Sequence, residues 1–169
     1  MDSRSAYAAY IRQHKAYVQE VYNKYGSVLY TVFPKVPVTE MEYRVRVHDA
    51  SKFDAEEFEP YRAYFYPKSG EQPDKAAMRK AWSHHYMNDD HHVEHWFGDE
   101  MSDAAIFEMI LDWEAMSIYH KSDCLAWFEN SEEKTLLHPD SRRKVYAAIK
   151  AIDKALDGTP IWEAVEDNS

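Results

Sequence analysis

The residues that break helices are few in this chain and lie close together. Of its 169 residues, 4 are glycine and 7 are proline, and the prolines fall near positions 34 to 37, 60 to 73, 139 and 160. Because glycine and proline most often end helices, this distribution leaves long stretches free to be helical. Apolar residues recur there at three-to-four spacing, which indicates amphipathic helices. The sequence therefore predicts an all-α bundle of about six to seven helices.

The individual helices are predicted from this spacing and from capping residues. The first is expected over residues 5–25 and stops at the glycine that follows. Residues 27–38 are apolar but hold two prolines, so we expect a buried connector there. Thr39 and Glu42 have the spacing of a capping box, which predicts a helix to about Lys52. Further helices are predicted over 54–66, 74–88, 103–120, 124–130 and 139–156, with a short segment at 91–96.

The length predicts one domain with one hydrophobic core. We expect a helical domain over residues 1–158, followed by an acidic tail, 159–169, that is loosely held. A single cysteine, Cys124, cannot form an internal disulfide and suits a reducing compartment. The chain begins without the basic-then-apolar run of a secretion signal, so a cytosolic protein is expected.

Charge and hydropathy limit the partners. Thirty acidic and 20 basic residues give a formal charge of −10, which repels the backbone of long nucleic acids. No window approaches the length of about 18 apolar residues that a membrane span requires. A small phosphorylated molecule remains possible, because basic residues can line a single pocket.

Polar residues occupy several positions where helical spacing predicts core. These are His14, His48 with its neighbour Asp49, His85 and Asp112. An unpaired carboxylate is costly to bury, so a buried aspartate needs a cation or several hydrogen-bond donors. Imidazole and carboxylate together are the ligands of zinc, iron, manganese and nickel, whereas calcium prefers oxygen ligands. The pattern predicts a metal site in which His14, His48 with Asp49, and Asp112 come from three separate helices.

The segment HHYMNDDHHVEHW is the richest in histidine. It holds His84, His85, His91, His92 and His95. This run could complete a second metal site.

The candidate ligands follow one another in a set order along the chain. A histidine comes first, then an adjacent His-Asp pair, then more histidines, and finally a lone aspartate on a later helix. Over roughly residues 7–120, this order resembles the HD-domain superfamily of metal-dependent phosphohydrolases. The resemblance implies an HD-like helical bundle. It also implies that His14, His48, Asp49 and Asp112 bind one divalent ion, and that members with intervening histidines bind two. For the second ion it points to His85 and to either His91 or His92.

The resemblance extends to groups that would act on a substrate. The block VHDASKF is similar to the HDxxK form of the motif, in which Lys52 would contact a substrate phosphate. Asp49 would be a bridging ligand or proton acceptor, and Glu108 would orient a ligand histidine or shuttle protons. The segments HDASKF, EEFEPYRAYFYP, AWSHHYMNDDHHVEHW and EMILDWEAMS also resemble a family of small proteins frequent in phages and bacteria.

Three functions follow as expectations. The first is hydrolysis of a small phosphate ester, such as a nucleotide, with one or two ions of Mn, Fe, Zn, Ni or Co. The second is oxidation by a diiron centre, because HD-like folds with extra histidines also resemble mixed-valence oxygenases. The third is a non-enzymatic binding protein, of the phage-like kind, in which the metal is structural. The identity of the metal distinguishes the first two, and loss of turnover on replacing Lys52 by alanine distinguishes the first from the third.

Overall fold

A computed structural model describes residues 2–166, and these residues form helices joined by loops, with no strand among them. The all-α prediction is confirmed. The described part holds nine α-helices and two short 3-10 helices, η1 and η2. Their bounds are α1 Ser3–Val32, α2 Val38–Val47, η1 Ala50–Phe53, α3 Ala55–Phe65, α4 Lys75–Asn88, η2 Val93–Trp96, α5 Asp103–His120, α6 Cys124–Asn130, α7 Glu133–Leu136, α8 Pro139–Leu156 and α9 Ile161–Glu166.

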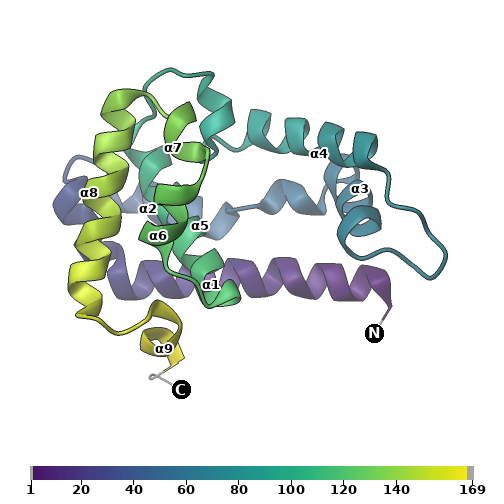
Figure 1. The fold of residues 1–169 in the computed structure, drawn as a ribbon, viewed down its shortest axis with the longest axis horizontal. Coiled ribbons are helices and arrows are strands. Elements are labelled where there is room, and N and C mark those ends of the chain that lie inside the picture. Colours follow the sequence, from purple (N-terminus) through teal and green to yellow (C-terminus); the bar gives the residue numbers. More distant parts are fainter. Residues whose placement is uncertain (1, 167–169) are drawn as a thin grey trace.

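Helix α1 is the long base of the molecule (Figure 1). Helices α5 and α8 pack against it, and α3 and α4 pack against each other near its N-terminal end. Residues 104–111 of α5 are all buried, which is typical of a helix enclosed by others. None of the described helices has the length and apolarity that a membrane crossing needs.

Helix α1 does not end at Gly26, so the predicted stop and the connector over 27–38 are wrong up to Val32. Gly26 is buried within the helix, and a Cβ there would lie 3.1 Å from ring carbons of Tyr22. The glycine therefore makes room for a tyrosine ring one turn earlier. The helix ends at Val32, and Phe33 is its C-cap, because the proline that follows Phe33 disfavours a helical conformation there.

The second helix is shorter than predicted. Its N-cap is Pro37, which makes no side-chain capping bond, so the capping box expected at Thr39 and Glu42 is wrong. The helix ends at Val47, before His48. His48 and the residues after it therefore lie in a tight turn rather than on a helix face.

The first part of the C-terminal segment forms a helix, which was not expected. Residues 161–166 form α9, which packs on α5 and α1, and Ile161 is buried. The expectation of a loosely held tail is wrong for these residues, because Ile161 adds to the apolar core. Residues 167–169 lie outside the described part of the chain.

Two clusters of apolar side chains form the interior. The larger one lies between α1, α2, α5 and α8, and includes Val18 and Met109. The smaller one lies between α1, α3 and α4, and includes Ile11 and Phe58. On α1, His14 stands between Ile11 and Val18, so the boundary between the two clusters is where polar side chains enter the interior.

Glu114 of α5 is a buried acid that forms no ion pair with any described residue. Its side chain is 1% exposed, and its Oε1 has no hydrogen-bond partner among the described residues. Burial, with a smaller contribution from Asp153, raises the pKa of Glu114 to about 8. The folded protein therefore holds a proton that the unfolded chain releases above its ordinary pKa of 4.5.

We expect Glu114→Gln to stabilise the protein increasingly as pH rises from about 4.5 to about 8. In this window the unfolded wild-type chain binds fewer protons than the folded protein, so wild-type stability falls as pH rises, and glutamine removes the effect. Near pH 8 the gain is on the order of 3 kcal/mol. Urea unfolding in chelator at several pH values measures it. The exposed Glu20→Gln is the matched control, and a pH-independent difference for Glu114→Gln would contradict the expectation.

Candidate metal centre

The chain positions His48 and Asp49 through the turn that follows α2. Asp49 adopts a left-handed backbone conformation, with φ of 55°. Aspartate and asparagine tolerate this conformation better than most residues, because a short polar side chain can bond locally. The turn buries both side chains, each 1% exposed, and continues into η1, which carries Lys52.

A first group of donor atoms gathers around Oδ2 of Asp49. His14 Nε2 lies 2.9 Å from Asp112 Oδ1 and 3.5 Å from Asp49 Oδ2. His48 Nε2 lies 3.7 Å from Asp49 Oδ2 and 3.8 Å from Asp112 Oδ1. The two imidazole Nε2 atoms are 3.4 Å apart. Ligand atoms held about 2.1 Å from one ion lie about 3.0 to 3.5 Å apart, so these four side chains come close to the spacing of a metal site.

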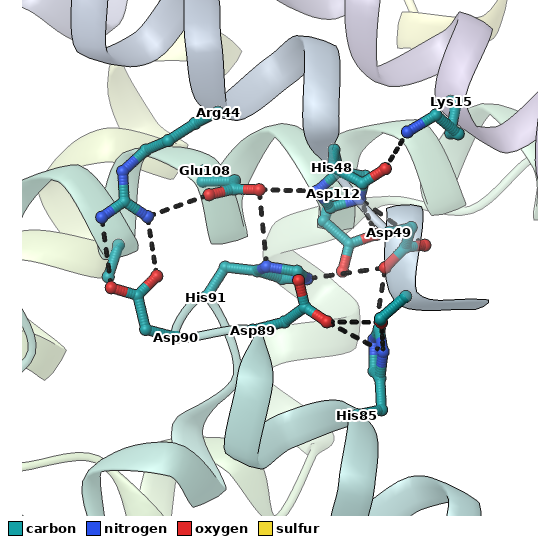
Figure 2. Close-up of polar contacts among 12 residues, drawn as sticks. Lys15, Arg44, His48, Asp49, His85, Asp89, Asp90, His91, Glu108 and Asp112 are labelled. Atoms are coloured by element: carbon teal, nitrogen blue, oxygen red, sulfur yellow. Dashed lines mark hydrogen bonds and ion pairs between the residues drawn. The ribbon is translucent and has the colours of Figure 1, made fainter. Parts of the chain in front are cut away.

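A second group gathers around the other oxygen of the same aspartate. Asp49 Oδ1 lies 3.2 Å from His85 Nε2 and 3.8 Å from His91 Nε2. Donor atoms of Asp49, His85, His91 and His92 all lie within 4.8 Å of one another. Figure 2 shows His85 reaching Asp49 from below and His91 reaching it from the left, beneath Glu108. Asp49 therefore stands between two groups of imidazoles, one facing each carboxylate oxygen.

The atoms that face the centre of the second group lack partners. Asp49 Oδ1 and the Nε2 atoms of His85, His91 and His92 are buried and have no hydrogen-bond partner among the described residues. Buried polar atoms are normally paired, and unpaired ones point to a missing water or ion. Because all four atoms are potential metal donors, a divalent cation fits this position. The donor set of nitrogen and oxygen suits Mn, Fe, Co, Ni or Zn.

Glu108 contacts the Nδ1 atoms of two histidines, on the ring edge that faces away from Asp49. Its Oε1 lies 2.8 Å from His48 Nδ1 and 3.4 Å from His91 Nδ1 (Figure 2). Arg44 donates to Glu108 Oε2 at 3.1 Å and to Asp90 at 2.6 Å. A carboxylate on Nδ1 leaves Nε2 free to ligate and fixes the orientation of the ring. Glu108 thus has the geometry for the orienting role expected of it.

The ring of His85 is also oriented through its Nδ1 atom, by a different set of polar side chains. Its Nδ1 lies 2.9 Å from Glu57 Oε2, 3.1 Å from Asp89 Oδ2 and 3.0 Å from Ser51 Oγ. Glu57 is fully buried, and its other oxygen lies 2.7 Å from His84 Nδ1. These contacts turn His85 Nε2 toward Asp49. His84 is instead at the rim, with a side chain that is 35% exposed.

Four residues of the site, Arg44, Glu57, Asp89 and Asp90, were not predicted from the sequence. Two signals in the sequence point to Arg44 and Asp89. Arg44 precedes His48 by four residues and Asp89 follows His85 by four, which is the spacing of neighbours on one face of a predicted helix. No such spacing indicates Glu57, because α3 brings it to His85 only through tertiary packing.

Charge in the cluster is mutually compensated. Burial opposes the ionised form of Asp49, but Lys52 and His48 outweigh it and hold its pKa well below the usual range. Burial also disfavours the protonated form of His85, yet the carboxylates of Asp49, Asp89 and Glu57, each within 3.2 Å of one of its ring nitrogens, raise its pKa to about 11. For His91 and His92, burial dominates and lowers each pKa to about 3. The neutral imidazole of His91 and His92 is the form that binds metals.

All residues predicted from sequence as ligands come together in one place. His14, His48, Asp49 and Asp112 form the first group, and His85, His91 and His92 form the second. Lys52 donates to Asp49 Oδ2 at 2.6 Å and is 21% exposed, so it lies between the buried cluster and the outside. Of the adjacent histidines His84 and His85, the buried His85 faces the centre of the cluster and His84 does not.

Three cavities border the cluster, and one of them, of about 410 Å³, is lined by Arg44, His91 and Glu108. The other two lie near the C-terminal half of α5. The larger has a volume of about 480 Å³ and is lined by Lys52 and by several aromatic residues. The smaller, of about 270 Å³, is lined by Asp112 and His92. The two share Trp82, Met116 and His120. The ligand groups therefore adjoin space that a small molecule can enter.

Comparison with known proteins leads to one family. Residues 3–151 match the model of a family of unknown function, DUF5662, and this span includes every residue of both donor groups. No curated protein and no solved structure gives a significant match. Since the match covers most of the chain, the protein belongs to the DUF5662 family.

Proposed function

We propose that this protein is a metal-dependent phosphohydrolase of HD type that acts on a small phosphate ester, such as a nucleotide. The observation that carries the proposal is Asp49, whose two oxygens face two groups of histidine Nε2 atoms. A carboxylate placed in this way can bridge two divalent ions. The order of ligands along the chain, and the lysine three residues after Asp49, agree with the HD resemblance.

The two ions would be held by the two donor groups, with Asp49 shared. When bound, such ions supply Lewis-acid activation of water and neutralise charge on a phosphoryl group. The protein's own contribution is to orient the ligands: Glu108 holds His48 and His91, while Glu57 and Asp89 hold His85. Glu108 is also placed to accept a proton from His48 Nδ1.

Lys52 is the residue we assign to the substrate phosphate. Its Nζ contacts Asp49 Oδ2 at 2.6 Å and lines the larger cavity. Burial lowers the pKa of Lys52, but Asp49 and Asp112 more than offset this and raise it above its ordinary value. A charged ammonium group at this boundary would stabilise negative charge that develops on a phosphoryl group.

The net charge and the single cysteine of the chain are compatible with a small substrate in a reducing compartment. The net charge of −10 disfavours long nucleic acid. Cys124 is a free and buried thiol, as expected in a reducing compartment such as the cytoplasm.

The proposal is tested with p-nitrophenyl phosphate and a panel of nucleoside monophosphates. We expect the protein loaded with Mn, Co or Ni to hydrolyse one of them under argon. Lys52→Ala should lower kcat/KM by about 100-fold, as for loss of a group that stabilises transition-state charge. Its metal content should stay unchanged, because Lys52 is not in either donor group.

The matched control is Lys80→Ala, which removes an exposed lysine of α4. A loaded protein that shows no turnover, or a Lys52→Ala variant with full activity, would refute the assignment. Turnover that needs oxygen and iron would favour the diiron oxygenase instead.

A further inference from the structure

The larger cavity beside the metal centre is walled mainly by aromatic rings. They come from four helices, α1, α3, α4 and α5, and from the residue that ends α3. Several of the rings contact one another: Tyr10 packs against Tyr66 with centroids 6.1 Å apart and against Tyr119 at 5.3 Å. The aromatic residues that line the cavity include Tyr10, Tyr61, Phe65, Tyr66, Trp82 and Tyr119. We call this space the ring cavity.

One wall of the ring cavity is polar. Lys52, which contacts Asp49, lines it. Tyr61 also lines it, is 6% exposed, and has a hydroxyl with no hydrogen-bond partner among the described residues. The ring of Tyr61 lies edge-on to that of His85, with centroids 6.5 Å apart. Two donors, one charged and one neutral, thus mark the side of the cavity next to the ligands.

The charge of the cavity limits what it can bind. Among the described residues that line it, Lys52 is the one lysine or arginine, and none is an aspartate or glutamate. A second phosphate, or a carboxylate far from Lys52, would meet mainly aromatic rings, with the imidazole of His120 as the one other nitrogen-bearing side chain besides Trp82 among these residues. The volume of about 480 Å³ is within the range of about 300 to 1,000 Å³ that is usual for small-molecule sites.

We propose that the ring cavity binds the alcohol part of a phosphate monoester, and that this part is an uncharged aromatic ring system. Lys52 and the Tyr61 hydroxyl hold the single phosphoryl group, and the aromatic wall holds the ring. This inference rests on the proposed function, because it takes the metal centre as the place of the phosphoryl group. The inference also states which substrates the site selects. Aromatic monophosphates are preferred over aliphatic monophosphates and over phosphate esters that carry more negative charge.

Binding of phosphonates, which are not hydrolysed, tests the inference without turnover. Calorimetry on the protein loaded with cobalt would compare methylphosphonate, benzylphosphonate and 4-carboxybenzylphosphonate. We expect benzylphosphonate to bind about tenfold or more tightly than methylphosphonate, since one good aromatic contact has about that effect. The carboxyl group should remove most of this advantage, because Lys52 is the one lysine or arginine among the described residues that line the cavity.

Variants assign the advantage to the cavity. Phe65 and Tyr119 line it and are 58% and 46% exposed, so the Phe65→Ala/Tyr119→Ala variant should fold. It should lower the benzyl-to-methyl ratio to about threefold or less. Phe97→Ala, at a site 76% exposed and outside the cavity, should leave the ratio unchanged. Tyr61→Phe removes only the hydroxyl and should weaken methylphosphonate and benzylphosphonate by the same factor.

The outcomes separate the two proposals. If benzylphosphonate and methylphosphonate bind equally, the ring cavity is not the alcohol site, while the phosphohydrolase remains supported. If neither binds to the loaded protein, the proposed function itself fails. If the ratio is unchanged in the double variant, the preference for a ring arises elsewhere and the inference is overturned.

Discussion

Replacing Asp49 with asparagine is expected to remove both ions and to lower turnover of phosphate esters by about 10³-fold or more. Among the residues that the structure describes, Asp49 alone contributes an oxygen to each donor group. Asparagine has nearly the same shape and tolerates the left-handed backbone at φ 55°, so the turn itself should persist. The amide, however, carries no negative charge and presents only one oxygen. Elemental analysis of the purified variant and p-nitrophenyl phosphate turnover measure the two effects.

Asp89→Asn is the matched control for this substitution. Asp89 is also an aspartate beside His85, but it contacts Nδ1 and not the side that faces Asp49. Losing such an outer partner typically costs about 10- to 100-fold in affinity or activity. Circular dichroism and unfolding in chelator would show that both variants fold. An Asp49→Asn variant that keeps two ions per chain would contradict the bridging assignment.

The positions of the ligands followed from sequence because each carries its own local signal. His14 and Asp112 lie on stripes of apolar residues, where a buried polar group needs a partner. His14 is buried, the side chain of Asp112 is 13% exposed, and the two lie 2.9 Å apart, which agrees with that argument. The ranges of α4, α5, α6 and α8 were also close to those predicted, because capping residues such as Asp74 and Ser102 mark their starts.

Other features depend on contacts that no local pattern contains. Gly26 looks like a helix end, but its role is to accommodate the ring of Tyr22. Glu57 looks like a residue of a helix's first turn, and only the packing of α3 on α4 brings it to His85. The ring cavity likewise draws residues from four helices. Sequence spacing could suggest that its aromatics are buried, but not that they enclose space beside Lys52.

Metal binding is expected to raise the thermal stability of the protein strongly. Two aspartates and five histidines gather around one point; Asp49 and four of the histidines are buried, and the inward-facing atoms of the second group have no hydrogen-bond partner among the described residues. A cation that binds this arrangement and not the unfolded chain stabilises the fold by mass action, by about 2.7 kcal/mol at a concentration 100 times its Kd. For a chain of this length, that corresponds to a rise in Tm of about 5 to 10 °C.

The measurement is a thermal melt of protein stripped with chelator, followed by addition of single ions. Manganese, cobalt, nickel and zinc should each raise Tm, and calcium should do so least, because it prefers oxygen ligands to the imidazoles that dominate both groups. The effect should weaken as pH falls, since protons compete with the metal for the histidine nitrogens. Asp49→Asn should abolish most of the rise, whereas Lys52→Ala should retain it. If no divalent ion changes Tm in the wild-type protein, the buried carboxylates are neutralised by His48, His85 and Lys52 alone, and the cluster is a hydrogen-bonded core rather than a metal centre.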